Sequence, residues 1–313
     1  MDIRNVQKTG NMFYAYLPTA WCRKYNIKPG SKISMQTSSD GTLAIFPHVT
    51  EKRLTNLTID LAEDDQSILN KILVASYINP TSSFKINLMK DVDIERLLDQ
   101  KKLISIEMVE FDSKHISCES SVAVEDPIPL LKTMVKKAKS MVGLIRKNYN
   151  KQLLQIYEDE IDRSKLLIEK SVINRLTFNE TTSIKAVYLH YSALISKDLE
   201  KAADQIGMLT TKDQAFLASI EASIEELWQI LEKISSSADV GISYTDVIVF
   251  AKKTEALNEG QKSNASYYSK LLVKQSLSNI SEVLFDWSIS HMVDRKYEKS
   301  LAAGSRTEDD RRK

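Results

Sequence analysis

Four of the acidic pairs that are spaced four residues apart in this sequence could each contribute ligands for a metal ion. Residues four apart lie on the same face of an α-helix, so each pair would present two carboxylates together. Two like charges in that position destabilise a helix unless a cation lies between them, and carboxylate oxygens suit hard divalent or ferric ions. The candidate metal ligands are Glu158, Asp162, Glu200, Asp204, Glu255, Glu259, Glu282 and Asp286.

The same pairs can also be interpreted as ordinary solvent-exposed acidic faces. With 42 acidic residues in a chain of 313, roughly five or six pairs of this spacing arise by chance. In the first half, Arg163 and Lys201 are close enough in sequence to pair with the carboxylates instead. Placement favours the metal, because one pair falls on each of two successive predicted helices in both halves of the helical region.

The sequence offers no set of residues for catalysis. His48, His115, His190 and His291 are scattered, and none has a second histidine at ligand spacing. There is no phosphate-binding loop, dinucleotide fingerprint or nucleophile elbow. The sequence therefore predicts a protein that is not an enzyme.

The first 50 residues carry a basic excess that the rest of the chain lacks. Six lysines and arginines against two aspartates give this segment a net charge of +4, which leaves about −3 for the remainder of a chain whose total is +1. The closely spaced phosphates of DNA require several cations on one docking face. The candidate DNA-binding residues are Arg4, Lys8, Asn11, Arg23 and Lys24. The alternative is that these cations are ordinary surface residues and the segment only dimerises.

Short strands and one short helix are expected in this basic segment. Met12–Leu17 is aromatic and apolar, as a buried strand would be, and Thr19 is a plausible N-cap for the helix. Lys28-Pro29-Gly30-Ser31 has the signature of a type II turn. Residues 33–36 and 43–46 predict a hairpin across an Asp-Gly turn. Because about 50 residues bury little core alone, dimerisation is expected.

Residues 51–125 have the pattern of a small α+β domain. Alternating apolar residues and helical spacings predict a βαβαββ unit. The strands are expected over 54–61, 83–89, 103–109 and 115–124, and the helices over 64–77 and 94–101.

Residues 126–300 are predicted to be helical. Asp126-Pro127 is a helix start signal, and apolar stripes at spacings of three and four follow it. Short loops between the stripes indicate antiparallel packing in two three-helix halves. The six helices are expected near 130–145, 152–173, 183–208, 213–234, 244–272 and 274–292. Residues 301–313 are expected to be a disordered tail.

The compartment is indicated by three negative features. Cys22 and Cys118 are far apart and fit no metal or redox motif, so both are expected to be reduced thiols. The first residues lack the apolar region of a signal peptide. No apolar run approaches the ~18 residues of a transmembrane helix. A cytoplasmic protein is therefore expected.

The N-terminal segment resembles the AbrB/SpoVT family of swapped-hairpin DNA-binding domains. The resemblance rests on Arg4–Gly10, Leu17-Pro18, Trp21–Gly30 and Gly41–Pro47 in that order. It implies an intertwined homodimer in which Arg4, Arg23 and Lys24 line one DNA-binding face. Many members carry arginine directly after the glycine where this chain has Asn11. Weaker and more salt-sensitive binding is therefore expected.

The helical segment is similar to PhoU, a two-repeat helical bundle connected to the regulation of phosphate uptake. That resemblance implies metal binding by Glu-x-x-x-Asp pairs on successive helices. The match is imperfect, because Lys201-Ala202 replaces the usual Arg-Ile and Glu259 stands where aspartate is expected. Together, the segments resemble archaeal AbrB–PhoU proteins, in which a linker domain corresponds to residues 51–125.

The expected fold is α+β, mainly α, with domains at 1–50, 51–125 and 126–300. The resemblance implies a DNA-binding transcriptional regulator of phosphate homeostasis whose bundle senses a metal, phosphate status or a partner protein. The alternative is a PhoU-type adaptor that restrains a phosphate transporter or a signalling protein. In that case the N-terminal domain would serve dimerisation alone.

Overall fold

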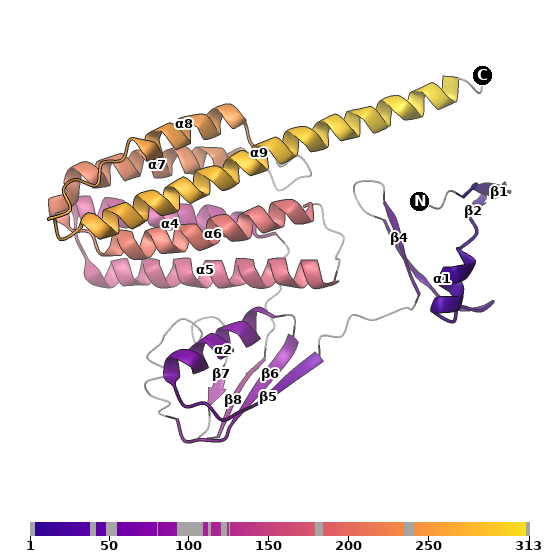
Figure 1. Ribbon diagram of the computed structural model, residues 1–313, viewed down its shortest axis with the longest axis horizontal. Coiled ribbons are helices and arrows are strands. Elements are labelled where there is room, and N and C mark those ends of the chain that lie inside the picture. The colour runs from indigo at the N-terminus through magenta and orange to yellow at the C-terminus, as the bar shows by residue number, and fades with distance from the viewer. Residues whose placement is uncertain are drawn as a thin grey trace. The chain divides into compact units, whose positions relative to one another are not determined.

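The computed structural model describes residues 4–37, 42–47, 55–79, 81–92, 109–111, 114–119, 124, 126–178, 184–234 and 241–310. The chain divides into two compact units, Met1–Arg53 and Leu54–Lys313. The fold is α+β and mainly helical (Figure 1), as the sequence predicts.

The first unit contains two antiparallel strand pairs and one short helix. Strands β1 (Gln7–Thr9) and β2 (Met12–Tyr14) pair around Gly10, and β3 (Ser34–Thr37) pairs with β4 (Leu43–Phe46). Gly10 has a φ of 60°, which glycine adopts without strain. The turn predicted across Ser39-Asp40-Gly41 lies outside the described residues.

The helix and the turn that follow β2 agree with the sequence in outline. Helix α1 covers Thr19–Lys24, but its N-cap is Pro18, so the prediction that Thr19 caps this helix is wrong. Pro18 can take that position because a capping residue has an extended backbone. The predicted Pro-Gly turn is present: Gly30 has a φ of 87°, and the Ser31 N–H donates to the Lys28 carbonyl at 2.9 Å.

The described residues of the first unit form no hydrophobic core within one chain. None of residues 4–35, 37 and 42–47 is buried. Met12, Phe13 and Tyr16 are 72%, 70% and 65% exposed. The prediction of a buried strand over Met12–Leu17 is therefore wrong for the single chain, in which β2 is also shorter. The physical reason is that two separate strand pairs and a six-residue helix provide no opposing layer against which these side chains could pack.

The second unit begins with a four-stranded sheet. Its strands are β5 (Thr55–Leu61), β6 (Thr81–Leu88), β7 (Val109–Phe111) and β8 (His115–Glu119), in the order β5-β6-β8-β7. Strands β5 and β6 are parallel and are connected through helix α2 (Gln66–Ile78). The remaining pairs are antiparallel. The helix predicted over 94–101 and most of the strand predicted over 103–109 lie outside the described residues.

Helix α2 joins the sheet to the helical bundle. Asp65 caps α2 by accepting from the Ile68 N–H at 3.0 Å. The buried residues of α2 and the sheet form one cluster that also contains Leu166 of the bundle. The Lys170 ammonium lies 3.9 Å from the centre of the Tyr77 ring. Through these contacts, the sheet and α2 pack against the first half of the bundle.

The bundle consists of long helices arranged in two groups of three. The first group is α4 (Ile128–Lys147), α5 (Lys151–Phe178) and α6 (Ala186–Gly207), and the second is α7 (Gln214–Glu232), α8 (Tyr244–Glu255) and α9 (Tyr267–Asp310). Helix α6 packs against α9, and α4 against α7 (Figure 1). The apolar stripes meet in a single core. Within it, fully buried Trp287 stacks on Tyr188 with ring centroids 5.6 Å apart.

Two boundaries in the second half differ from the prediction. A continuous helix was expected over 244–272, but α8 ends at Glu255 and α9 begins at Tyr267. The intervening segment is polar and contains Gly260 with a φ of 80°, which interrupts helical backbone geometry. Helix α9 then passes without a break through Val273 and continues to Asp310. The segment from 301, which was predicted to be disordered, is therefore helical up to that residue.

A buried ion pair joins the start of α7 to α9. Asp213 ends a short 3-10 helix, Thr211–Asp213, between α6 and α7. It accepts from Lys270 Nζ at 2.7 Å and from Ser266 Oγ at 2.6 Å, and the Asp213 and Lys270 side chains are only 7% and 11% exposed.

Among the described helices, none is long and apolar enough to cross a membrane.

Candidate functional site

Three of the predicted metal ligands meet on the surface between α5 and α6. One ligand oxygen from each of Asp162, Glu200 and Asp204 can be chosen so that all three lie within 4.8 Å of one another. Asp162 is buried at 6% exposure, whereas Glu200 and Asp204 are half-buried. The structure therefore brings together carboxylates that are separated by about forty positions in the sequence.

The two helices place these carboxylates through their packed faces. Ile161 precedes Asp162 on α5, and both Leu199 and Ala203 on α6 lie directly before the acidic residues. All three apolar residues belong to the bundle core. Because the core side chains fix the rotation of each helix, the adjacent acidic side chains are held at the edge of the same contact.

Glu158 lies one turn away from this group, against the end of α6. A Cβ atom on Gly207 would stand 1.9 Å from Glu158 Oε1, so the glycine leaves the space that this carboxylate occupies. Glu158 is one helical turn before Asp162, and Gly207 is about one turn after Asp204. Glu158 is thus placed at the edge of the three-carboxylate group.

The donor set consists of carboxylate oxygens, which are the ligands that hard cations prefer. Three carboxylates that crowd together repel one another, and a bound cation would remove that repulsion. Asp162, Glu200 and Asp204 could supply the ligands for a divalent or ferric ion, with Glu158 nearby and water completing the shell. Lys201, proposed as an alternative partner of these acids, forms an ion pair with Asp198 at 3.0 Å. Arg163 is exposed on α5.

The second predicted set is distributed differently. Glu255 is exposed and accepts from Ser278 Oγ at 3.4 Å, and Glu259 forms an ion pair with Lys274 at 3.1 Å. Burial would raise the pKa of Glu259, but backbone and Lys274 hydrogen bonds lower it overall. Glu282 and Asp286 lie on an exposed face of α9. Within the described part of the chain, these four residues form no three-carboxylate group like that on α5 and α6.

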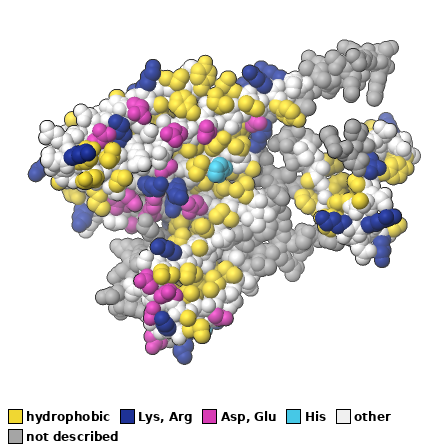
Figure 2. Space-filling model, in the orientation of Figure 1, with side chains coloured by type: hydrophobic (Ala, Val, Ile, Leu, Met, Phe, Trp, Pro, Cys, Tyr) yellow, Lys and Arg dark blue, Asp and Glu magenta, His cyan; other side chains and the backbone are white. Residues whose placement is uncertain are grey.

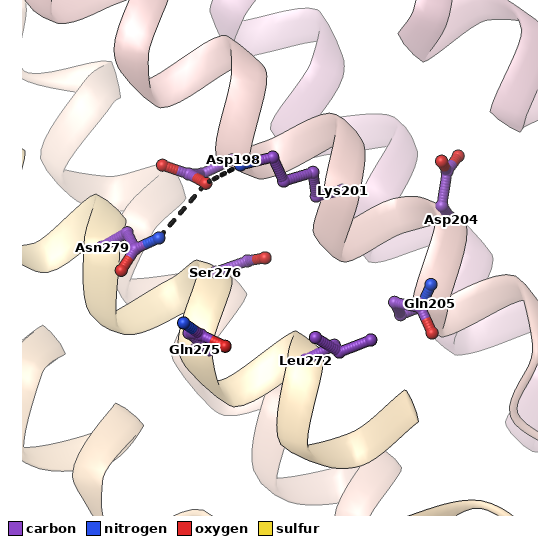
Figure 3. A pocket seen from close by; sticks show the side chains of 8 residues that line it. All are labelled: Asp198, Lys201, Asp204, Gln205, Leu272, Gln275, Ser276 and Asn279. Carbon is purple, nitrogen blue, oxygen red and sulfur yellow. Dashed lines mark hydrogen bonds and ion pairs between the residues drawn. The ribbon is translucent and has the colours of Figure 1, made fainter. Parts of the chain in front are cut away.

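A hollow of about 260 Å³, lined mainly by polar residue types, adjoins the first set between α6 and α9 (Figure 3). Asp198 accepts there from Lys201 and from Asn279 Nδ2 at 3.3 Å. Asp204 lines this hollow as well as belonging to the carboxylate group. This hollow is absent from the predictions made from the sequence. The helical spacing of Asp198, Lys201 and Gln205 on α6 is a signal for one wall, but the opposing wall on α9 could not be paired with it from sequence. The residues that line it are Asp198, Lys201, Asp204, Gln205, Leu272, Gln275, Ser276 and Asn279.

All five predicted DNA-binding residues are exposed on the first unit: Arg4, Lys8, Asn11, Arg23 and Lys24. Lys8 and Asn11 lie on the two sides of the Gly10 turn, and the Lys8 ammonium lies 5.4 Å from the Phe13 ring centre. Arg23 and Lys24 occupy the last turn of α1, where they also interact favourably with the helix dipole. Figure 2 shows basic and hydrophobic side chains side by side on this unit.

Replacing Asp162 with asparagine is expected to weaken Mn²⁺ binding by about 10–100-fold, because the most buried carboxylate of the group would lose its charge. Isothermal titration of the full chain with Mn²⁺ measures the effect. Asp159→Asn is the matched control, since Asp159 lies on the same helix and accepts from Gln155. Equal Mn²⁺ affinities for wild type and Asp162→Asn would contradict a metal site at these residues.

None of the three histidines that the structure describes belongs to the three-carboxylate group. His190 is exposed beside Tyr191, with ring centroids 6.1 Å apart, and His291 lies beside Gly241. His115 is half-buried in the sheet, and His48 is outside the described residues.

Searches with family models, against curated proteins and against solved structures found no match for this chain.

Proposed function

We propose that this protein is a dimeric DNA-binding transcriptional regulator whose helical bundle senses a metal ion or a partner connected with phosphate uptake. The N-terminal unit would contact DNA, and the bundle would carry the sensing surface. The phosphate connection is supported by the resemblance of the helical segment to PhoU.

The observation that carries the proposal is the combination of exposed cations and exposed apolar side chains on the first unit. In the single chain, Met12, Phe13 and Tyr16 are mostly exposed. Burial of these apolar side chains in an interface would favour association of two copies of the unit. Two associated copies would double the local positive charge that Arg4, Lys8, Arg23 and Lys24 provide. The larger number of cations on one face would allow the dimer to neutralise several of the closely spaced phosphates of a DNA duplex.

The carboxylate group on α5 and α6 supplies a sensing element in this proposal. A cation bound by Asp162, Glu200 and Asp204 would connect two helices of the same half. If the bound state favours one arrangement of the two bundles in a dimer, metal binding and DNA affinity become thermodynamically coupled. The coupling is reciprocal, so that DNA would also raise or lower the metal affinity.

The double variant Arg4→Ala/Arg23→Ala is expected to bind DNA about 10–100-fold more weakly than wild type at low salt. A dimer would lose four cations from its binding face. The measurement is fluorescence anisotropy of the full chain on labelled duplexes drawn from a pool of promoter sequences.

Lys147→Ala/Lys151→Ala is the matched control, because it removes two exposed cations from the bundle of the same full chain. It should leave the affinity within about twofold, because the proposal assigns the phosphate contacts to the first unit. Equal weakening by both double variants would mean that binding follows net charge alone. Absence of DNA binding by wild type would instead favour the adaptor function, in which the first unit only dimerises.

A further inference from the structure

An exposed seam runs along the middle of α9. Its members are spaced alternately four and three apart, which keeps them on one side of the helix. They are Glu282, Asp286, Ile289, Val293, Lys296 and Ser300, and all six are exposed. The opposite side of the same helix carries the buried Leu284 and Trp287. The bundle therefore uses one face of α9 and leaves the seam uncovered.

The apolar residues of the seam lie at its centre. Ile289 is 53% exposed and Val293 is 61% exposed, and the adjacent Met292 and Tyr297 are 41% and 64% exposed. Asp294 still contacts the start of α6, through Tyr188 Oη at 2.5 Å and Lys185 Nζ at 3.1 Å. Beyond that point α9 extends past the other helices of the bundle (Figure 1). This part of the helix is therefore accessible to another chain.

The charges of the seam are divided between its two ends. Glu282 and Asp286 are acidic, whereas Lys296 and the neighbouring Lys299 are basic and exposed. In a parallel pair of these helices, like charges would face each other. In an antiparallel pair, the acidic end of each helix would face the basic end of its partner, which makes the seam complementary to itself.

We propose that α9 pairs with α9 of a second copy of this chain as a short antiparallel coiled coil, centred at His291. Ile289 then packs against Val293 of the other copy, and Met292 lies beside its own counterpart. Asp286 faces the other copy's Lys296, and Glu282 lies next to its Lys299. The contact is self-complementary, as a two-fold interface requires, and it is independent of DNA binding and of metal binding.

This pairing gives Glu282 and Asp286 a role other than metal binding. They would select the antiparallel orientation, because a parallel arrangement sets acid against acid and base against base. Within one chain, Asp286 and Lys296 are separated by nearly three turns of helix, so a direct intrachain pair is excluded. A charge reversal at the acidic end of the seam can therefore be compensated by a charge reversal at the basic end only if the two ends meet in a pair of chains.

Cross-linking of the full chain tests the pairing. The variant Ile289→Cys/Val293→Cys should form a disulfide-linked dimer under mild oxidation, visible on a non-reducing gel. Tyr268→Cys is the control: Tyr268 is 68% exposed on the same helix, but it lies 23 residues before His291, so the two copies of this position would be about 70 Å apart in the antiparallel pair. Equal cross-linking of the control would show random collision and overturn the proposal.

Charge reversal then tests the orientation in the same cysteine variant. Glu282→Lys/Asp286→Lys alone should lower the cross-linked fraction by about tenfold, since it places like charges together. Adding Lys296→Glu/Lys299→Glu should restore it. Circular dichroism confirms that each variant is folded. Cross-linking that is insensitive to the one-sided reversal, or that the combined reversal fails to restore in a folded protein, would overturn the pairing. In that event, the seam would have a different occupant.

Discussion

Replacing Asp213 with alanine is expected to lower the free energy of unfolding by about 3–5 kcal/mol, because it leaves the buried Lys270 ammonium without its carboxylate. The substitution also removes the acceptor of the Thr210 N–H and of the Ser266 hydroxyl. Urea unfolding followed by circular dichroism measures the change. A cost below about 1 kcal/mol would mean that this pair contributes no more than a surface salt bridge.

Two comparisons separate the buried pair from ordinary charge effects. Asp246→Ala removes the partner of Lys233 in an ion pair whose side chains are 30% and 59% exposed, and should cost within about 1 kcal/mol. Asp213→Ala combined with Lys270→Met should be more stable than Asp213→Ala alone, because no unpaired buried charge remains.

The same aspartate makes stability depend on acid pH. Burial would raise the pKa of Asp213, but hydrogen bonds from Lys270, Ser266 and the Thr210 N–H outweigh it and lower the pKa to about 2. The ordinary value of 3.8 applies in the unfolded chain. The stabilisation is therefore complete above about pH 4 and is lost as the pH falls towards 2. Asp213→Ala should lack this component of the acid unfolding profile.

Replacing Phe13 with aspartate is expected to raise the dissociation constant of the N-terminal dimer by about 10²–10⁴-fold. Burying one phenylalanine is worth about 1.5–3 kcal/mol, and a two-fold interface loses two of them. In the single chain Phe13 is 70% exposed, so the substitution would cost little without a partner. A large effect therefore reports an intermolecular contact.

Hydrogen exchange of the backbone amides in β1 and β2 is the measurement, because it reports on the first unit even if α9 also holds two copies together. In wild type, protection should rise with protein concentration, as association stabilises the folded unit by mass action. Phe13→Asp should abolish this rise. Tyr268→Asp, at an exposed position of the other unit, should not. Concentration-independent protection in wild type would exclude dimerisation through this unit.

The sequence predicted elements better than it predicted the contacts between them. The apolar stripe of α4 and the Pro-Gly turn at Gly30 follow from local periodicity and backbone chemistry, and both are present. The break between α8 and α9 was misplaced because Val273 continues a helical stripe that sequence alone cannot tell from the start of a new one. The chain instead leaves helical geometry at Gly260, which has a positive φ, in the polar stretch before α9.

In the candidate metal site too, the sequence predicted the positions on each helix but not the contact between the helices. Spacing of four put Asp162 beside Glu158, and Glu200 beside Asp204, on predicted helix faces. Only the packing of α5 against α6 reveals that Asp162, Glu200 and Asp204 converge and that Glu158 lies against Gly207. The same spacing at Glu282 and Asp286 instead marks an exposed face of α9. The spacing of two carboxylates cannot distinguish these outcomes, because it carries no information about which helix lies opposite.

The salt dependence of DNA binding by the full wild-type chain tests the central claim most directly. If four cations on each of two first units approach phosphates, the logarithm of the binding constant should fall with the logarithm of salt concentration, with a slope between about −3 and −7. Anisotropy titrations between low and physiological salt give this slope. A steep negative slope is the result that we expect of a DNA-binding regulator. Absence of binding at low salt, or a slope near zero, would contradict it.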